Sequence, residues 1–443
     1  MRSGQRALLV NPWIHDFAAY DFWARPYGLL CLGSALRQAG WRVSLIDCLH
    51  PAWPGRKGPF PARRPDGSGK YDQEIIPKPP QISFFPRNWK RYGIPPPAFK
   101  KLLSETPVPD VVFVNTVMTY WYTGVRETIA FLRESFPKAP VVAGGVYASL
   151  LPEHTARETG ADHVAKGDFR TSVPPLLERL GLPSRLISDE FSPAWDLYDG
   201  PLSGAVLTGR GCQYNCAYCA VPRLHGNLRR RPPEEAVEKI KDLYFNYGVT
   251  DVAFFDDALR AGGDDHLAAV LEGIIGLSAP LRLHFINALH VRGLSREMVS
   301  LFRKANVSTL RFGLETTSPE RGKALGDKAS LEDFADACDK LKKEGYVGRE
   351  IGAYLLSGLP EQPPSEIEQG IKSVIKAGGR PYLSEYSPIP GTVLWETARE
   401  HSRLDIASEP LFHNNILLPS AHPDLTLGKM NELKDLAKRS FRK

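Results

Sequence analysis

Short apolar runs alternate with stretches of helical spacing along the first 180 residues. Arg6 to Asn11 is apolar and ends in turn residues, which is typical of a buried parallel strand. Leu29 to Ala39 has helical spacing and ends at Gly40. Further strands are predicted at Trp41–Asp47, Asp110–Thr116, Ala139–Ala143 and His163–Ala165, with a helix at Gly124–Ser135. This alternation predicts an α/β domain over residues 1–182, a doubly wound parallel sheet with helices on both faces.

A second alternating series follows a connector at residues 183–204. Strands are predicted at Ala205–Leu207, Asp251–Asp256, Leu283–Ala288, Thr309–Leu314, Glu350–Leu356 and Tyr382–Tyr386. The intervening helices are predicted at Pro233–Tyr247, His266–Leu277, Arg296–Ala305, Leu331–Glu344 and Pro364–Ala377. Six such units over residues 205–393 predict a partial (β/α)6 barrel of the TIM type. Residues 394–443 are predicted to form a basic, helical tail.

Residues 51–100 interrupt the first series, show no helix or strand period and are predicted to form an irregular, partly extended insertion. They hold 12 prolines, and their ten lysines and arginines against three acidic residues give a net charge of +7. Since the whole chain carries +6, the rest of it is nearly neutral. Eight aromatic residues in this insertion argue against disorder. We expect a lid or side wall for a cofactor or substrate rather than a nucleic-acid groove, because no recognised RNA-binding module follows the barrel.

Composition limits the class of protein. Of the 443 residues, 42% are hydrophobic and 24% are charged, which is typical of a globular chain and excludes wholesale disorder. No apolar stretch is long enough for a membrane span, and the first apolar run, Ala7 to Val10, is too short for a signal peptide. Six cysteines are too few for a disulfide scaffold. We therefore expect a cytoplasmic protein without a membrane partner.

Three of the six cysteines form a C-x3-C-x2-C motif directly after the first predicted barrel strand: Cys212, Cys216 and Cys219. Three thiolates on one loop can surround a metal centre. Zinc sites usually have four ligands, and His225 is the nearest further candidate. A [4Fe–4S] cluster suits three thiolates equally well and leaves one iron open to an external ligand. The count of ligands alone leaves both metals open.

The triplet, with Tyr218 just before the third cysteine, resembles the signature loop of the radical S-adenosylmethionine (SAM) superfamily, and the resemblance extends over about residues 205–392. Residues 254–257 occupy the place where the family binds the methionine amino group. Residues 311–316 resemble its ribose-contacting strand end, and residues 354–361 its adenine-contacting strand, although Tyr354 replaces a glycine. The resemblance implies SAM contacts at Tyr218, Asp256, Asp257, Glu315, Leu356 and Gly358.

Each carboxylate also has a structural interpretation. Asp256 could cap the following segment, and Glu315 could pair with Arg311. The resemblance further implies that the three cysteines bind three irons and that SAM chelates the fourth. One electron would then cleave the sulfonium bond and give methionine and a 5′-deoxyadenosyl radical. A one-electron donor such as flavodoxin or ferredoxin is the partner that this chemistry implies.

Residues 1–182 resemble the cobalamin-binding Rossmann-like domain of one radical SAM subclass. The matching residues fall where predicted strands end or the first helix begins, which is where ligands of such sheets bind. They are Asn11, Pro12, Gly28, Asn115, Thr116, Gly144, Gly145, Tyr147 and Gly167. The D-x-H-x-x-G motif that supplies a cobalt ligand in many cobalamin proteins is absent. His15 lies in the corresponding loop, but its flanking residues do not match.

The sequence therefore predicts a radical SAM enzyme that uses cobalamin to methylate an unactivated centre of a small-molecule or peptide substrate. Two alternatives stay open. One is a cobalamin-free radical SAM enzyme that performs a cyclisation, rearrangement or oxidation. The other is a non-catalytic iron–sulfur or zinc protein that binds an anionic partner.

Overall fold

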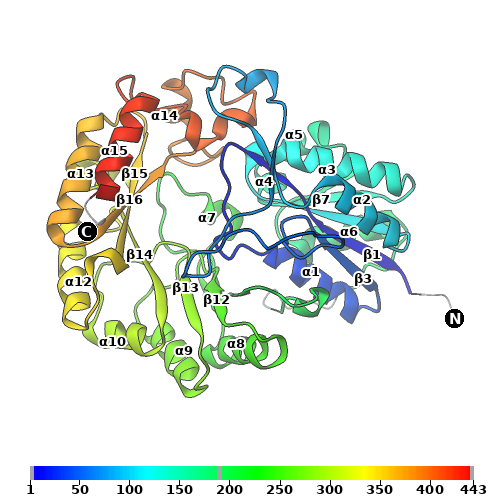
Figure 1. Cartoon of the computed structure of the whole chain (residues 1–443), viewed down its shortest axis with the longest axis horizontal. Helices are drawn as coiled ribbons and strands as arrows, with labels where there is room; N and C mark the ends of the chain where they lie inside the picture. Colours follow the sequence, from blue (N-terminus) through cyan, green and yellow to red (C-terminus); the bar gives the residue numbers. More distant parts are fainter. Residues whose placement is uncertain (1–3, 187–191, 440–443) are drawn as a thin grey trace. The chain divides into compact units, whose positions relative to one another are not determined.

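The computed structural model describes residues 4–186 and 192–439. The chain divides into two compact units, Met1–Pro201 and Leu202–Lys443. Each unit contains its own parallel sheet with helices packed against it (Figure 1). Among the described residues, no helix is both long and apolar enough to cross a membrane. The predicted fold class, a doubly wound sheet followed by a partial barrel, is confirmed.

The first unit has a five-stranded parallel sheet in the order β3-β1-β6-β7-β8. Its strands are β1 (Arg6–Asn11), β3 (Arg42–Asp47), β6 (Val111–Thr116), β7 (Val141–Gly145) and β8 (His163–Ala165). Its helices are α1 (Tyr27–Gln38), α2 (Pro96–Glu105), α3 (Tyr122–Ser135), α4 (Val146–Leu150), α5 (Pro152–Glu158) and α6 (Phe169–Arg179). This is a doubly wound order in which the direction of winding reverses between β1 and β6.

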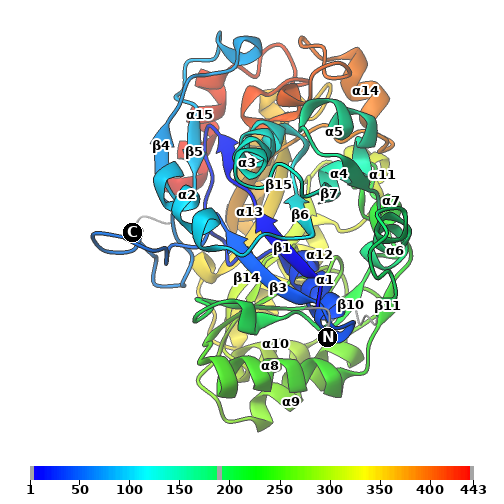
Figure 2. The same ribbon diagram turned by 90° about the vertical axis from the view of Figure 1, so that its right-hand side faces the viewer.

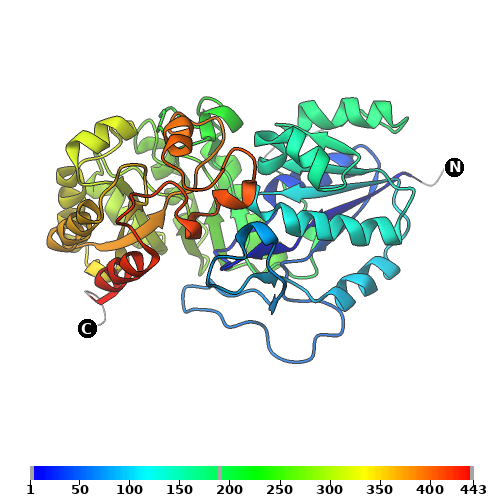
Figure 3. The same cartoon turned by 90° about the horizontal axis from the view of Figure 1, so that it is seen from above.

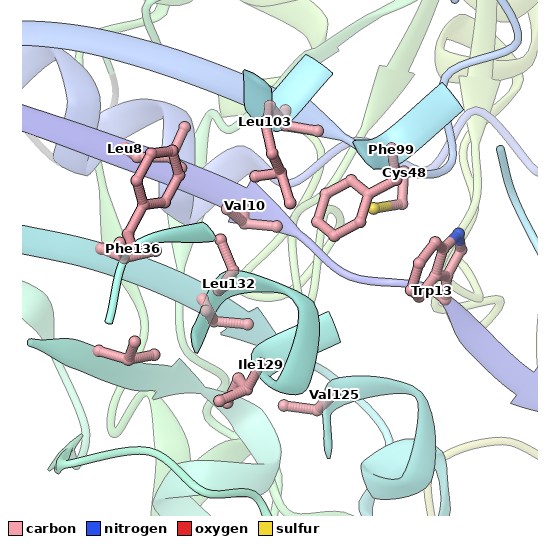
Figure 4. Close-up of a cluster of buried hydrophobic side chains, with 14 of the residues drawn as sticks. Leu8, Val10, Trp13, Cys48, Phe99, Leu103, Val125, Ile129, Leu132 and Phe136 are labelled. Atoms are coloured by element: carbon pink, nitrogen blue, oxygen red, sulfur yellow. The ribbon is translucent and has the colours of Figure 1, made fainter. Parts of the chain in front are cut away.

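Alternate residues of β1 pack into two separate cores. Leu8 and Val10 lie in a cluster with residues of α2 and α3, including Phe99 and Ile129 (Figure 4). Leu9 lies in the opposite cluster, with residues of α1 and α6. Because successive side chains of a strand point to opposite faces, α2 and α3 cover one face of the sheet and α1 and α6 cover the other.

The insertion contains more regular structure than its composition indicates. Strand β5 (Lys90–Tyr92) pairs antiparallel with β2 (Ile14–Asp16) and β4 (Gln73–Ile75) (Figure 2). Helix α2 begins at Pro96, inside the stretch that was expected to be irregular. That expectation was wrong because three-residue strands are too short to show a period, and prolines fit the first turn of a helix. Residues 51–70 do form a loop without helix or named strand (Figure 3).

The second unit has six parallel strands in the order β16-β15-β14-β13-β12-β9, and β9 and β16 are its two edges. The strands are β9 (Gly204–Val206), β12 (Asp251–Phe254), β13 (Arg282–Phe285), β14 (Val307–Glu315), β15 (Ile351–Ser357) and β16 (Arg380–Glu385). Helices cover the outer face of this curved sheet (Figure 1): α8 (Pro233–Tyr247), α9 (Asp265–Gly276), α10 (Arg296–Lys304), α12 (Leu331–Lys343) and α13 (Pro364–Ala377).

Shorter elements lie between the strands and helices of the second unit. They are β10 (Gly209–Arg210), α7 (Val221–Leu224), β11 (Arg229–Arg230) and α11 (Pro319–Leu325). The tail contains α14 (Trp395–Glu400) and α15 (Leu427–Arg439). Lys434 of α15 forms an ion pair with Glu385 at the end of β16. The tail is therefore attached to the edge of the sheet.

The contact of Phe312 with an outer helix shows which residues of β14 point to the inner face of the sheet. Phe312 of β14 packs edge-on against Phe334 of the outer helix α12, with ring centroids 6.4 Å apart. Side chains alternate along a strand, so Arg311 and Gly313 of β14 lie on the inner face. The strand is irregular after Gly313, but the Glu315 carboxylate lies 2.7 Å from where a Cβ on Gly313 would be, which places it on the same face.

Candidate functional site

The cysteine loop follows β10 and is anchored by its main chain at several points. Gly211 N–H donates to Asp257 Oδ2 at 2.8 Å, and Cys212 N–H donates to the Gly226 carbonyl at 3.2 Å. Gly211 has φ +84°, and a Cβ there would lie 2.4 Å from the Asn227 carbonyl oxygen, so only glycine fits this close approach. The three cysteines are therefore presented on a loop whose start is fixed.

The sulfur atoms receive hydrogen bonds from the loop itself. Tyr214 N–H lies 3.4 Å from Cys212 Sγ, and Val221 N–H lies 3.4 Å from Cys219 Sγ. The Tyr218 hydroxyl is within hydrogen-bond reach of Cys216. N–H groups directed at cysteine sulfur are among the features that tune iron–sulfur clusters. The donor set thus fits a cluster bound by three thiolates.

Burial raises the pKa of the Cys216 and Cys219 thiols. In the part of the chain that the structure describes, no three His, Cys, Asp or Glu side chains are grouped closely enough to hold one metal ion. The cysteines of a cubane cluster each bind a different iron, so they do not need to converge on one point.

Asp256 and Asp257 hold main-chain segments of the site. Buried Asp256 accepts hydrogen bonds from the Thr208 hydroxyl at 2.7 Å and from Thr208 N–H at 3.1 Å. Arg230 lies 3.7 Å from its carboxylate. Burial raises the pKa of Asp256 to about 6. Asp256 therefore braces the segment that leads into the cysteine loop, rather than capping the segment that follows it.

His225, the fourth candidate ligand for zinc, is engaged elsewhere. Its Nδ1 lies 2.7 Å from Asp257 Oδ2, the oxygen that also accepts from Gly211 N–H. One carboxylate thus ties His225 to the first residue of the cysteine loop. Asp257 was predicted to contact SAM, and the structure places it at the base of the loop.

Glu315 lies at the carboxyl end of β14, with φ +65° and a mostly buried side chain. Its Oε1 is 3.5 Å from Lys328 Nζ, and the Tyr218 hydroxyl is within hydrogen-bond reach of its carboxylate. A Cβ on Gly313 would lie 2.7 Å from both the carboxylate and the ammonium group. Glu315 therefore joins the cysteine loop to the inner face of the sheet, and it pairs with Lys328 rather than with Arg311.

The two predicted contacts on β15 differ in their surroundings. Leu356 belongs to an apolar cluster against which Tyr218 packs, and its carbonyl accepts a hydrogen bond from Gln362 at 3.1 Å. Gly358 has φ +78°, and a Cβ there would lie 3.2 Å from Leu418 of the tail. The structure brings Leu356 to the cysteine loop, whereas Gly358 faces the tail.

His290 was not identified from the sequence. Its ring stacks on Tyr214 of the cysteine loop, with centroids 4.2 Å apart. Burial, together with the nearby charges of Lys328 and Arg260, lowers the pKa of His290 to about 3, so the imidazole is neutral at pH 7. Tyr214 and His290 are 76 positions apart in the sequence, and no local pattern links them.

A row of polar side chains crosses the carboxyl ends of three neighbouring strands in the first unit. Asn115 Nδ2 donates to Asn11 Oδ1 at 3.0 Å, and Asn11 Nδ2 donates to Asp47 Oδ1 at 2.7 Å. The Tyr198 hydroxyl donates to Asp47 Oδ2 at 2.6 Å. Thr116 continues the row, since its hydroxyl donates to the Gly144 carbonyl at 2.9 Å. Asp47 and Tyr198 were not predicted.

The residues predicted to contact cobalamin divide into exposed and buried sets. The exposed or half-buried members are Gly28, Asn115, Gly144, Gly145 and Gly167. The buried members are Asn11, Pro12, Thr116 and Tyr147. The Tyr147 ring is fully buried, and its hydroxyl lies 2.6 Å from His154 Nδ1. The buried members are therefore placed to support the edge of the sheet rather than to offer their side chains to a ligand.

The same edge holds buried polar atoms that lack partners. His50 Nε2 and the Nε and Nη2 atoms of Arg25 have no hydrogen-bond partner among the described residues. His15, in contrast, is engaged at both nitrogens, by Thr123 at 3.2 Å and by Glu127 at 2.8 Å. The unpartnered atoms of Arg25 and His50 are buried, so the side chains that this edge exposes are those of the half-buried and exposed residues named above.

Comparisons with known proteins are consistent with this geometry. The family model of the Radical SAM superfamily matches residues 206–374. An uncharacterized methyltransferase of Pyrococcus horikoshii is 26% identical over 331 residues, which cover 66% of this chain and 69% of the relative.

Two solved structures share the fold of both units. The radical SAM methyltransferase TsrM of Kitasatospora setae, with tryptophan substrate and a SAM analogue bound, aligns with a TM-score of 0.67 and 17% identity. That alignment covers 98% of this chain and 89% of TsrM, and a further TsrM structure contains cobalamin and a [4Fe–4S] cluster. The cobalamin-dependent SAM radical enzyme OxsB aligns with a TM-score of 0.57 and 13% identity, covering 98% of this chain and 61% of OxsB.

Proposed function

We propose that this chain, which is a radical SAM enzyme, is a cobalamin-dependent methyltransferase that acts on a small-molecule or peptide substrate. The observation that carries the proposal is the joint presence of two features in one chain. A barrel presents an anchored three-cysteine loop, and a separate doubly wound unit has exposed or half-buried glycines and a half-buried Asn115 at the carboxyl edge of its sheet. TsrM and OxsB, which share this two-unit fold, are described with cobalamin bound.

When bound, the cluster and SAM supply one-electron cleavage of SAM, and cobalamin supplies a carrier for the methyl group. The residues of this chain would hold and orient these groups. Cys212, Cys216 and Cys219 would bind three irons, and the Asp257 carboxylate fixes the start of their loop. Glu315, which pairs with Lys328, holds the Tyr218 hydroxyl against the inner face of the sheet.

At the edge of the first unit, we assign the contacting role to the exposed members of the predicted set. Asn115 and Gly144 are half-buried at neighbouring strand ends, and Gly167 has open space above its Cα. Asn11 and Thr116 would position them, because both are buried and hydrogen-bonded within the edge.

Reconstitution tests the cluster. After anaerobic loading with iron and sulfide, we expect about four irons per chain, and 5′-deoxyadenosine should form when SAM and a reductant are added. Cys216→Ala should abolish both. Cys338→Ala is the matched control, because Cys338 is fully buried in α12 and should leave both unchanged. Zinc in place of iron would contradict the proposal.

Cobalamin binding is tested separately. Chain purified with hydroxocobalamin should retain nearly one corrin per chain, measured from its visible spectrum. Asn115→Ala should lower that fraction, whereas Asn246→Ala, on the exposed face of α8, should not. Label from SAM carrying an isotopically labelled methyl group should reach the bound corrin. Radical formation without corrin retention would instead favour a cobalamin-free radical SAM enzyme.

A further inference from the structure

Two arginines lie in one row across the inner face of the second sheet. Arg311 of β14 is opposite Gly352 of β15, and Gly352 is opposite Arg380 of β16. The next row toward the carboxyl ends holds Tyr354 and Tyr382, which are also register partners. Since Arg311 lies on the inner face, these register partners lie on it as well.

The glycine between the arginines lets their side chains approach each other. A Cβ on Gly352 would lie 2.5 Å from Arg311 Cδ and 2.9 Å from Tyr382 Cε2. The Arg311 side chain and the Tyr382 ring therefore meet over Gly352. The Arg311 guanidinium carbon lies 4.2 Å from the Tyr382 ring centroid, and that of Arg380 lies 4.9 Å from it. Two guanidinium groups thus gather on one phenol ring.

No carboxylate compensates these two charges in the described part of the chain. The acidic residues of the six strands are Asp251, Glu315 and Glu385. Asp251 binds His284 and Arg282, Glu315 binds Lys328, and Glu385 binds Lys434.

Among residues 4–186 and 192–439, Arg311 donates only to the carbonyl of its neighbour Leu310, at 2.7 Å. Two like charges on one ring repel each other, and a cation–π contact returns only about 0.5–2 kcal/mol. A bound anion would remove that repulsion.

We infer that Arg311 and Arg380, with Tyr354 and Tyr382, form a receptor for the anionic group of the substrate, a carboxylate or a phosphate. This inference rests on the proposed function, because it describes the substrate of the same barrel. Planar guanidinium groups suit both anions, since each can donate two parallel hydrogen bonds.

The row lies on the amino-terminal side of Glu315, which follows Arg311 by four residues on β14. The register of β14 against β15 shifts between Gly313 and Glu315, and the Glu315 carboxylate reaches back to within 2.7 Å of where a Cβ on Gly313 would lie. A substrate that is held by its anion at Arg311 would therefore extend along the inner face of β14 toward Glu315 and the cysteine loop.

Binding of simple probes to the reconstituted full-length chain tests the receptor. We would titrate benzoate and its neutral analogue benzamide, and phenyl phosphate as the second anion, and follow ligand NMR saturation transfer. Benzoate or phenyl phosphate should bind and benzamide should not. Arg311→Gln and Arg380→Gln should each weaken the binding of the anion at least fivefold. The stronger anion in the wild-type chain identifies the group as carboxylate or phosphate.

The matched control is Arg303→Gln. Arg303 also lies over a tyrosine ring, 3.7 Å from the Tyr346 centroid, but it pairs with Glu350. Binding should therefore be unchanged in this variant. If a Gln variant loses its thermal transition, Arg311→Lys serves instead, because it keeps the charge but not the planar fork.

Equal binding of benzoate, phenyl phosphate and benzamide, or anion binding that neither Arg311 nor Arg380 affects, would overturn the inference. The measurement requires neither SAM cleavage nor cobalamin. A failure of methyl transfer with anion binding intact would thus refute the proposed function and leave the receptor standing. Absence of anion binding with methyl transfer intact would refute the receptor and leave the proposed function standing.

Discussion

Three glycines of the predicted cobalamin edge should respond very differently to the same added methyl group. Gly145 has φ +110° and ψ −160°, a region that is almost restricted to glycine. A Cβ there would lie 2.3 Å from the Thr116 carbonyl oxygen. Backbone strain of about 1–3 kcal/mol and overpacking of about 1–3 kcal/mol add to a loss of about 2–6 kcal/mol for Gly145→Ala.

Gly167 and Gly28 provide comparisons for the stability loss expected of Gly145→Ala. Gly167 has φ +79°, but a Cβ added there would have no other atom within 4 Å, so Gly167→Ala should cost only about 1–2 kcal/mol of backbone strain. Gly28 lies in helix α1 without positive φ and also has open space. Gly28→Ala should therefore be neutral or stabilising, by up to about 1 kcal/mol.

Urea unfolding followed by tryptophan fluorescence measures the three changes, and corrin retention is measured in parallel. If the ligand lies against this edge, Gly28→Ala should lower corrin retention without lowering stability, because its methyl group enters space that only the ligand would fill. Equal stability of Gly145→Ala and Gly167→Ala would refute the steric reasoning. Undiminished corrin retention in Gly28→Ala would remove Gly28 from the contact set.

Other variants test the second unit. Burial raises the pKa of Asp256 from 3.8 to about 6, so the folded chain binds more protons than the unfolded chain in that window. Stability should fall by about 3 kcal/mol as pH rises from 3.8 to 6, and Asp256→Asn should flatten this dependence in unfolding curves measured at each pH. Asp257→Asn removes the charge from a hydrogen bond to Gly211 N–H worth about 1.5–3 kcal/mol. An iron chelator should therefore strip iron faster from this variant, and an unchanged rate would exclude the anchoring role. Gly352→Ala should displace Arg311, cost about 1–3 kcal/mol and weaken binding of the anionic probe, whereas unchanged binding would contradict the close packing over Gly352.

The regular elements could be predicted best where backbone chemistry marks their ends. Helix α8 begins at Pro233 and ends before Gly248, and α13 begins at Pro364 and ends before Gly378, as expected from the sequence. Both glycines have positive φ, which other residues avoid. The strand predicted at residues 283–288 instead ends at Phe285, because the apolar pattern continues after pairing with β12 has stopped.

Side-chain partners could not be predicted in the same way. Arg311 and Glu315 are four residues apart, a spacing that brings charges together on a helix. A strand rises about 3.3 Å per residue, more than twice the rise of a helix, so the two residues are not brought together, and Glu315 pairs with Lys328, which comes from the following segment. His225 is likewise within reach of the cysteine loop, yet it binds Asp257 from the loop after β12. Such partners depend on how separate segments meet, which no local pattern contains.

The difference between residues that set backbone geometry and residues whose side chains make contacts determines which residues of a motif should be tested for ligand contact. The motif around β6 and β7 specifies backbone geometry, and Thr116 and Tyr147 serve that geometry from buried positions. Substituting them would change ligand binding through the fold, so loss of corrin in those variants would not identify a contact. Asn115 is half-buried at the same edge, and its amide donates only to Asn11 in the described structure. A loss of corrin in Asn115→Ala at unchanged stability would therefore be evidence for contact with the cofactor.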